Sequence, residues 1–302
     1  MDCKDKRVAE VCRIFPDIIR TTLTYQDMDF NKLQEIRLRI NQPLICIYDN
    51  REVIIHKITI TSQIIRETME HVSNYSLYAF EEEIKQGFIT ITGGHRVGIA
   101  GKTIIENGYV KTIKYISFIN VRLSHQIKGC SDKVLKFAHK EDRLMHTLII
   151  SPPGCGKTTL LRDLIRQISN GTSDYMGQTV GVVDERSEIA ACYMGIPQND
   201  LGIRTDVLDC CPKDEGMIML IRSMSPKVIA IDEIGKVSDV EAIEYIINCG
   251  CTVIGSVHGD SYEDIKQKPI LNRLINEKLF NRFIVLSKDN GVGTIKDLIS
   301  LE

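Results

Sequence analysis

The sequence lacks the features that would place the chain in a membrane or mark it for secretion. No apolar run approaches the roughly 20 residues that a membrane-spanning helix needs. The first ten residues are charged rather than signal-like. We therefore expect a cytoplasmic protein.

The chain also lacks an excess of charge, internal repeats and low-complexity segments. Its net charge is −2, and lysine and arginine are spread along it, so no basic footprint of the kind found in nucleic-acid-binding domains is present. Apolar residues at 43% and charged residues at 26% are near the averages for globular proteins. This composition favours neither disorder nor a fibrous architecture, and it argues against nucleic acid as a partner.

Cysteine pairs with the spacing of metal ligands are missing, although ten cysteines are present. Cys210 and Cys211 are adjacent, and Cys249 and Cys251 are two apart, spacings that do not build a tetrahedral zinc site with any nearby histidine. Without a signal peptide, we expect reduced thiols in packing positions rather than disulfides.

At 302 residues the chain is long enough for two domains, since a domain usually takes roughly 100–200 residues. Short polar residues and glycine punctuate the chain between Ser124 and Ser131, where a helix capped by Ser131 is expected to begin. We predict an N-terminal domain over residues 1–125 and a second domain over residues 126–302.

The N-terminal domain is predicted to be a small α+β domain with an opening helix and a second helix at Gln63–Val72. Its strands are expected at Ile36–Ile40, Leu44–Tyr48, Val53–Ile60 and Val110–Leu123. The glycine-rich run 87–101 is typical of a β-hairpin whose turn is Gly93-Gly94.

In the second domain, short β-branched runs alternate with amphipathic stretches, the pattern of parallel strands joined by crossover helices. Strands are expected at Thr147–Ile150, Thr179–Val183, Val228–Ile231, Thr252–Val257 and Phe283–Leu286. Helices are expected at Thr159–Ile168, Glu215–Met224 and Val240–Asn248. This order predicts an α/β domain in which helices flank a twisted parallel sheet.

The eight residues from 151 to 158 read Ser-Pro-Pro-Gly-Cys-Gly-Lys-Thr and lie between a predicted strand and a predicted helix, as a phosphate-binding loop does. Glycine lets the backbone N–H groups approach the phosphates, and Lys157 reaches their oxygens. Thr158 is expected to ligate Mg²⁺. The residues expected to bind ATP are Ser151, where the motif usually has glycine, and then Pro152, Pro153, Gly154, Cys155, Gly156, Lys157, Thr158 and Thr159.

Two other apolar strands end in paired carboxylates. Asp232 and Glu233 follow one of them, and we expect Asp232 to hold Mg²⁺ and Glu233 to polarise the attacking water. Asp184 and Glu185 follow another, so Glu185 is a second candidate for activating the water. The alternative for Glu185 is a carboxylate that stabilises a helix N-terminus.

His258 follows the strand predicted at Thr252–Val257. The carboxyl ends of parallel strands meet at one edge of a sheet, so His258 is expected beside the phosphate site, where it can sense the γ-phosphate. The alternative is a structural histidine.

With these elements in this order, the chain resembles the secretion ATPase superfamily of type II and type IV secretion and pilus motors. The matching elements are the Walker A loop, an acidic box at Asp184-Glu185, Glu233 of Walker B and a histidine box at His258. A closer similarity, to the sporulation stage III AA family, runs along nearly the whole chain. It is carried by EIRLRINQPL at 35–44, GGHRVGIAG at 93–101, SFINVRL at 117–123, VVDERSEIA at 182–190 and IAIDEIG at 229–235.

The resemblance implies a RecA-like P-loop ATPase that forms a hexameric ring in the mother cell. It also implies association with the membrane through the membrane proteins of a transenvelope channel. In secretion motors, arginines of the N-terminal domain reach the nucleotide, and the candidates here are Arg37, Arg39, Arg96 and Arg122. The alternative for these arginines is a solvated strand face. One departure is Asp232, where many secretion motors have glycine.

Together these observations predict an ATPase that hydrolyses MgATP to drive assembly or operation of a secretion-like channel during sporulation. One alternative is a RecA-like nucleic-acid translocase, since such folds also move along DNA. The other is a non-catalytic scaffold gated by nucleotide. The presence of Lys157, Thr158, Asp232 and Glu233 argues against the scaffold, because a pure switch does not need Glu233.

Overall fold

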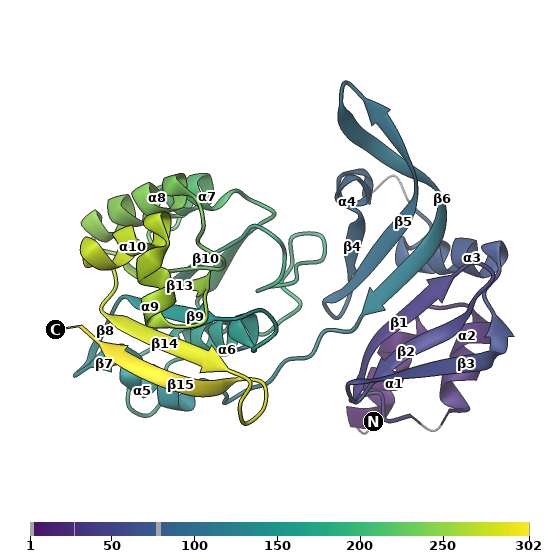
Figure 1. Ribbon diagram of the computed structural model, residues 1–302, viewed down its shortest axis with the longest axis horizontal. Coiled ribbons are helices and arrows are strands. Elements are labelled where there is room, and N and C mark those ends of the chain that lie inside the picture. Colours follow the sequence, from purple (N-terminus) through teal and green to yellow (C-terminus); the bar gives the residue numbers. More distant parts are fainter. Residues whose placement is uncertain (1–2, 27, 77–79, 302) are drawn as a thin grey trace. The chain divides into compact units, whose positions relative to one another are not determined.

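The computed structural model describes residues 3–26, 28–76 and 80–301, which form two compact units, 1–125 and 126–302 (Figure 1). Each unit has its own sheet and its own buried apolar residues. In the described part of the chain, no helix combines the length and the apolar character needed to cross a membrane.

The first unit is built on a six-stranded sheet in the order β3-β2-β1-β6-β5-β4, with every neighbouring pair antiparallel. Its strands are β1 (Leu33–Arg39), β2 (Pro43–Tyr48), β3 (Arg51–Thr59), β4 (Phe88–Ile91), β5 (His95–Glu106) and β6 (Tyr109–Arg122). Its helices are α1 (Cys3–Cys12), α2 (Asp17–Thr24), α3 (Ser62–Val72) and α4 (Glu81–Gln86). The α+β class and the predicted strands are confirmed.

Two details of this unit concern glycine and proline. Gly93 and Gly94 form the predicted turn between β4 and β5, with φ of +86° and +72°, a region that favours glycine. The expected opening helix is present as α1, and a second, separate helix, α2, follows it and was not predicted. Pro16 is the N-cap of α2, and proline has no N–H with which to continue a helix that precedes it.

Alternation along the central strands gives this sheet a buried face and a polar face. Ile36 and Leu38 of β1 are fully buried, whereas Arg37 and Arg39 project to the other side. The strands β5 and β6 form a long hairpin that extends beyond the neighbouring strands (Figure 1).

The second unit is built on a seven-stranded sheet in the order β11-β10-β12-β13-β9-β14-β15. Its strands are β9 (Thr147–Ser151), β10 (Val180–Asp184), β11 (Thr205–Asp209), β12 (Val228–Ile231), β13 (Thr252–His258), β14 (Arg282–Ser287) and β15 (Thr294–Ser300). All pairs are parallel except β14 with β15. The predicted parallel strands are confirmed. The two edge strands, β11 and β15, were not predicted, because their half-exposed sequences contain no continuous apolar run.

Helices cover both faces of this sheet (Figure 1). They are α5 (Asp132–Ala138), α6 (Lys157–Asn170), α7 (Lys213–Ser223), α8 (Val237–Asn248), α9 (Tyr262–Gln267) and α10 (Pro269–Asn276), and a small β7–β8 ladder pairs His139–Lys140 with Arg143–Leu144. The helices α7 to α10 pack into one apolar core, and α5 and α6 pack into a second core on the opposite face. The two cores hold the parallel strands rigidly, so the strand ends are fixed points for a site.

The expected capping role of Ser131 is wrong. Ser131 does occupy the N-cap position of α5, but its hydroxyl makes no capping hydrogen bond. Its Oγ and its backbone N–H both donate to Oδ2 of Asp163 in α6, at 2.8 and 2.9 Å. Burial opposes the charge on Asp163, but these bonds and those from Arg166 and Gln167 outweigh it and hold its pKa at about 2. The serine therefore ties α5 to α6, the helix that begins at Lys157.

Candidate functional site

The predicted phosphate-binding loop connects the end of β9 to the start of α6. Gly154 and Gly156 have φ of +68° and +86°, so the loop depends on glycine at both positions. Ser151 is fully buried at the strand end, and its hydroxyl donates to the carbonyl oxygen of Pro152 at 2.8 Å. The loop therefore leads into a helix N-terminus whose backbone N–H groups suit an anion.

Lys157 is buried beneath this loop and contacts the carboxylates that follow β12. Its Nζ donates to Oδ1 of Asp232 at 2.7 Å and lies 3.4 Å from Oε1 of Glu233. It also donates to Oγ of Ser256 at 3.3 Å. The lysine expected to bind phosphate thus contacts two carboxylates.

The Asp232 carboxylate accepts hydrogen bonds from two hydroxyl groups. Thr158 Oγ1 donates to its Oδ2 at 2.9 Å, and the Ser256 hydroxyl donates to its Oδ1. Burial opposes the charge on Asp232, but the Lys157 ammonium and these hydroxyls hold its pKa below the ordinary value. An ionised carboxylate beside a threonine hydroxyl is the oxygen donor set that Mg²⁺ prefers, completed by substrate phosphates and water. The described residues contain no group of three or more His, Cys, Asp and Glu side chains that suits a metal ion.

Glu233 has an unusual backbone conformation for a residue with a side chain. Its φ is +53°, in the left-handed region that costs strain for any residue except glycine. The conformation is held by its own N–H, which donates to Asp232 Oδ1 at 2.9 Å and lies 3.1 Å from Ser256 Oγ. Such strain is common where a side chain must be aimed at a reacting group.

The Glu233 carboxylate is surrounded by donors. His258 Nε2 lies 2.8 Å from Oε1, and Arg186 Nη1 lies 2.6 Å from Oε2. Burial raises the pKa of Glu233, but Lys157, His258 and Arg186 outweigh that effect and hold it below the ordinary value. Glu233 is therefore ionised at neutral pH.

Glu185 lies at the end of β10 and bonds to two lysines. Lys213 Nζ donates to its Oε2, and Lys236 Nζ donates to its Oε1 at 3.2 Å. Burial opposes its charge, but these two lysines lower its pKa. The partner at the start of α7 is the side chain of Lys213 rather than a backbone N–H, so these contacts differ from those of a carboxylate at a helix N-terminus.

A cavity of about 20 Å³ lies between the two acidic strand ends. It is lined by Asp184, Glu185, Arg186, Glu188, Lys213, Asp232 and Glu233. A volume of this size holds about one water molecule. The cavity therefore places a water-sized space against both candidate bases.

Asp184 has a different role from its neighbour Glu185. Its buried carboxylate accepts the backbone N–H groups of Glu188, Ile189 and Ala190 at 2.8, 2.9 and 2.8 Å. Burial raises its pKa to about 6, against those three bonds. Asp184 shapes the loop that carries Glu185 and Arg186.

In the first unit, the four candidate arginines project from one face of the sheet. Glu35 of β1 is opposite Arg122 of β6, and Arg122 is opposite Arg96 of β5, so these residues share the face of Arg37 and Arg39. All four arginines therefore lie on the face of the sheet opposite to the one that carries the buried apolar side chains.

These arginines differ in what holds them. Arg37 pairs with Glu35 at 2.6 Å, and Arg122 Nε lies 3.9 Å from the same carboxylate. The Arg96 guanidinium stacks at 3.6 Å from the ring centre of Phe88. Arg39 makes no ion pair with any residue that the structure describes.

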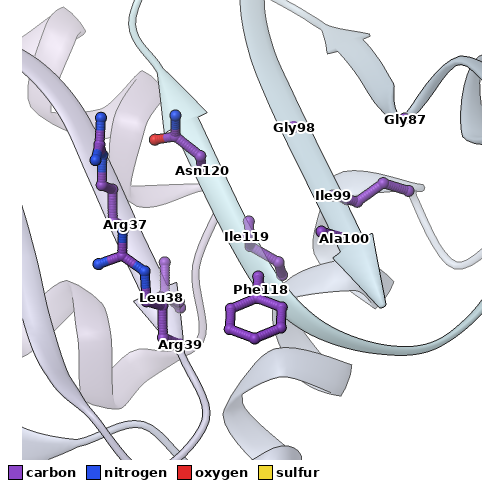
Figure 2. Close-up of a pocket in the computed structure, with 10 residues that line it drawn as sticks. All are labelled: Arg37, Leu38, Arg39, Gly87, Gly98, Ile99, Ala100, Phe118, Ile119 and Asn120. Carbon is purple, nitrogen blue, oxygen red and sulfur yellow. The ribbon is translucent and has the colours of Figure 1, made fainter. Parts of the chain in front are cut away.

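A groove of about 320 Å³ lies on the same face. Arg37 and Arg39 lie along one side of it (Figure 2). Gly98 and Ala100 of β5 are small and leave space, and Phe118 of β6 lies beside Arg39 (Figure 2). The groove has a cationic wall, which suits an anionic group.

Four side chains of the cluster were missed from the sequence: Arg186, Lys213, Lys236 and Ser256. Ser256 lies two residues before His258 on β13, and that spacing places both on one side of a strand, so it carried a usable signal. Lys213 contacts Glu185 from 28 residues away and has no such signal.

The family described as "Sporulation stage III, protein AA" matches residues 4–300. Stage III sporulation protein AA of Bacillus subtilis (strain 168) is 42% identical over 290 residues, which are 96% of this chain and 94% of that protein. The uncharacterized protein ycf45 of Porphyra purpurea is 33% identical over 156 residues, half of this chain and 26% of that protein.

Two solved structures have a similar fold. The Legionella pneumophila ATPase DotB has a TM-score of 0.60 at 14% identity, over 90% of this chain and 76% of that chain. The pilus retraction motor PilT, solved with bound ADP, has a TM-score of 0.59 at 16% identity, over 89% of this chain and 76% of that chain. At these identities the likeness concerns the fold, and it confirms the expected RecA-like secretion ATPase architecture. The match along almost the whole sequence settles the family: the chain belongs to the sporulation stage III, protein AA family.

Proposed function

We propose that this protein is an ATPase that binds MgATP at the loop 151–158 and hydrolyses it. The observation that carries the proposal is the convergence of Lys157, Thr158, Asp232, Glu233 and His258 in one hydrogen-bonded cluster. These residues come from α6, from the segment after β12 and from the end of β13, at the carboxyl edge of one parallel sheet.

Nucleotide binding uses the loop and the side chain of Lys157, which changes partners when the phosphates bind. The backbone N–H groups at the start of α6 and the Lys157 ammonium bind the phosphate oxygens. Lys157 then exchanges Asp232 and Glu233 for the phosphates, which releases both carboxylates. Thr158 and Asp232 hold Mg²⁺, which supplies charge neutralisation on the phosphates.

Hydrolysis uses Glu233 as the base. Its lowered pKa keeps it ionised, so its carboxylate can polarise the attacking water and accept its proton. The water-sized cavity beside Glu233 and Glu185 supports this role. His258 orients Glu233 through the 2.8 Å contact. From the end of its strand it also senses the γ-phosphate. Glu185, neutralised by two lysines, is the second candidate base.

The four arginines of the first unit supply positive charge to the nucleotide of a neighbouring subunit. A loose phosphoryl-transfer transition state spreads charge over the γ-oxygens, and an arginine from a partner stabilises it. The shared face and the cationic groove support this assignment. Arg39, one of the four, makes no ion pair with a described residue. The proposal requires a homo-oligomer, and a hexameric ring is its natural form.

The wider role that we propose is to drive assembly or operation of a transenvelope channel during sporulation, from the cytoplasm of the mother cell and in contact with membrane proteins. It is supported by family membership and by the fold shared with the pilus retraction motor.

The test is phosphate release by the purified full chain with ATP and Mg²⁺, with and without a chelator, compared with Glu233→Gln. Mg²⁺-dependent turnover in the parent alone supports the proposal. Turnover that requires added single-stranded DNA would favour a translocase. Tight ATP binding without turnover would leave a scaffold gated by nucleotide.

A further inference from the structure

The loop between β14 and β15 is attached to the phosphate-binding loop. The backbone N–H of Gly293 donates to the carbonyl oxygen of Cys155 at 3.1 Å. A Cβ built on Gly156 would lie 3.3 Å from Cγ1 of Val292 and 3.4 Å from the Gly293 backbone. The segment 288–293 therefore lies against the loop 151–158, although the two segments are far apart in sequence.

Lys288 begins this segment, and its head group lies over the phosphate-binding loop. A Cβ built on Gly154 would lie 3.3 Å from Lys288 Nζ and 3.7 Å from its Cε. The ammonium thus covers the position that glycine leaves open. Any larger residue at 154 would meet both this ammonium and the strain of a φ of +68°.

The charge of Lys288 is available to a ligand. Among the described residues, no carboxylate pairs with Lys288, whereas Lys157 is shared between Asp232 and Glu233. A phosphate chain that binds at the loop must draw Lys157 away from two carboxylates. Lys288 has no such contact to break with any described residue, because its side chain is exposed and no carboxylate among them pairs with it.

We propose that Lys288 is a second cationic ligand of the nucleotide phosphate chain, supplied by the same subunit as the loop. The inference rests on the proposed nucleotide site. It adds a residue from the β14–β15 hairpin to that site. Lys288 would supply positive charge within one subunit, whereas the four candidate arginines would supply it from a neighbouring subunit. A lysine acts as a mobile point charge on phosphate, so it needs reach rather than a fixed geometry.

The test measures the affinity of the full chain for ATP, ADP and AMP by calorimetry. We compare the parent with Lys288→Gln, Lys288→Arg and the matched control Lys296→Gln, an exposed lysine on β15 of the same hairpin. We expect Lys288→Gln to weaken ATP binding about tenfold, the scale of one hydrogen bond to a charged group. ADP should lose affinity too, AMP least, and Lys288→Arg and Lys296→Gln should stay within about threefold of the parent.

The outcomes separate the inference from the proposed function. If the parent binds ATP and Lys288→Gln binds it equally well, the role of Lys288 is refuted and the nucleotide site stands. An equal loss in Lys296→Gln would likewise refute it, since the effect would then be one of general charge. If the parent binds no nucleotide, the proposed function fails and the inference fails with it. Circular dichroism checks that each variant is folded.

A mixing experiment tests whether Lys288 acts within its own subunit. Lys288→Gln subunits retain their catalytic carboxylates, and Glu233→Gln subunits retain Lys288. If Lys288 serves its own site, adding Glu233→Gln subunits should leave unchanged the ATP concentration at which Lys288→Gln subunits reach half-maximal activity. A return of that concentration to the parent value would place Lys288 at a neighbour's site and overturn the assignment.

Discussion

Glu233 and His258 are joined through Oε1 and Nε2 at 2.8 Å, from the ends of two neighbouring parallel strands. The contact links the proposed base to the strand that also carries Ser256, which bonds to Asp232 and Lys157. A change at either strand end should therefore alter the hydrogen bonds of the whole proposed phosphate site.

The first prediction concerns Lys157→Ala. Removing the ammonium deprives the phosphate chain of its buried charge, so ATP binding should fall below detection by calorimetry. The fold should survive, as circular dichroism can check. The control is Lys296→Ala, an exposed lysine outside the cluster, which should bind as the parent does. Parent-like ATP affinity in a folded Lys157→Ala would show that the loop is not the phosphate site.

The second prediction separates the two candidate bases. Glu233→Gln keeps the shape of the side chain but removes the charge that accepts a proton, so turnover should fall about 100-fold or more while ATP binding persists. Glu185→Gln should lose less, because Glu185 contacts Lys213 and Lys236, whereas Glu233 lies 3.4 Å from Lys157 of the predicted phosphate-binding loop. If Glu185→Gln were the more damaging change in phosphate-release assays, Glu185 would be the base.

The third prediction concerns the pH profile of His258→Ala. The histidine helps to hold the pKa of Glu233 low, so its removal should raise that pKa. A base works only when deprotonated, and activity falls as pH falls through its pKa. The acidic limb of kcat should therefore move to higher pH in His258→Ala, and His258→Gln, which keeps a donor, should move it less. An unchanged limb would mean that His258 does not act on Glu233.

The fourth prediction is that a neighbouring subunit completes the site. A partner's arginine can be worth about 10³-fold or more in rate, so specific activity should rise with protein concentration. Glu233→Gln subunits have intact arginines, and Arg96→Ala subunits have intact carboxylates. Mixing them should restore part of the lost activity, and the experiment is repeated with the other three arginines. Turnover independent of concentration, with no recovery in any mixture, would show that each subunit works alone.

The fifth prediction concerns Asp184→Ala, which leaves three buried N–H groups without an acceptor. Unfolding in urea at pH 7.5 should show a loss of about 2 kcal/mol or more, since each orphaned donor costs about 1–3 kcal/mol. The exposed Asp174→Ala is the control.

The pH dependence of that loss has a defined sign. Burial raises the pKa of Asp184 to about 6, so the folded parent retains this proton at a pH where the unfolded chain has lost it. The stabilising contribution of Asp184 therefore declines as pH rises from about 4 to 6. The difference between parent and Asp184→Ala should be about 1 kcal/mol larger at pH 5 than at pH 7.5. A difference that grows with pH would contradict this.

Local pattern was sufficient for the parallel strands and for the loop between β9 and α6. Strand ends bearing Asp232 and His258 could be placed at one edge because parallel strands align their carboxyl ends. The proposed roles of these residues stay predictions. The same local pattern did not predict the edge strands β11 and β15 or the helix boundary at Pro16. Half-exposed or interrupted segments carry little periodic signal.

The sequence by itself determined the α/β class and the phosphate-loop motif, because each depends on residues close together in the chain. It also determined the family, through matching segments along nearly its whole length. Only the tertiary structure decided which side chains meet. Ser131 bonds to Asp163 instead of capping its own helix, Lys213 holds Glu185, and Lys288 reaches the loop at Gly154. Such contacts depend on how helices and strands pack across long separations in sequence, and periodicity carries no information about that.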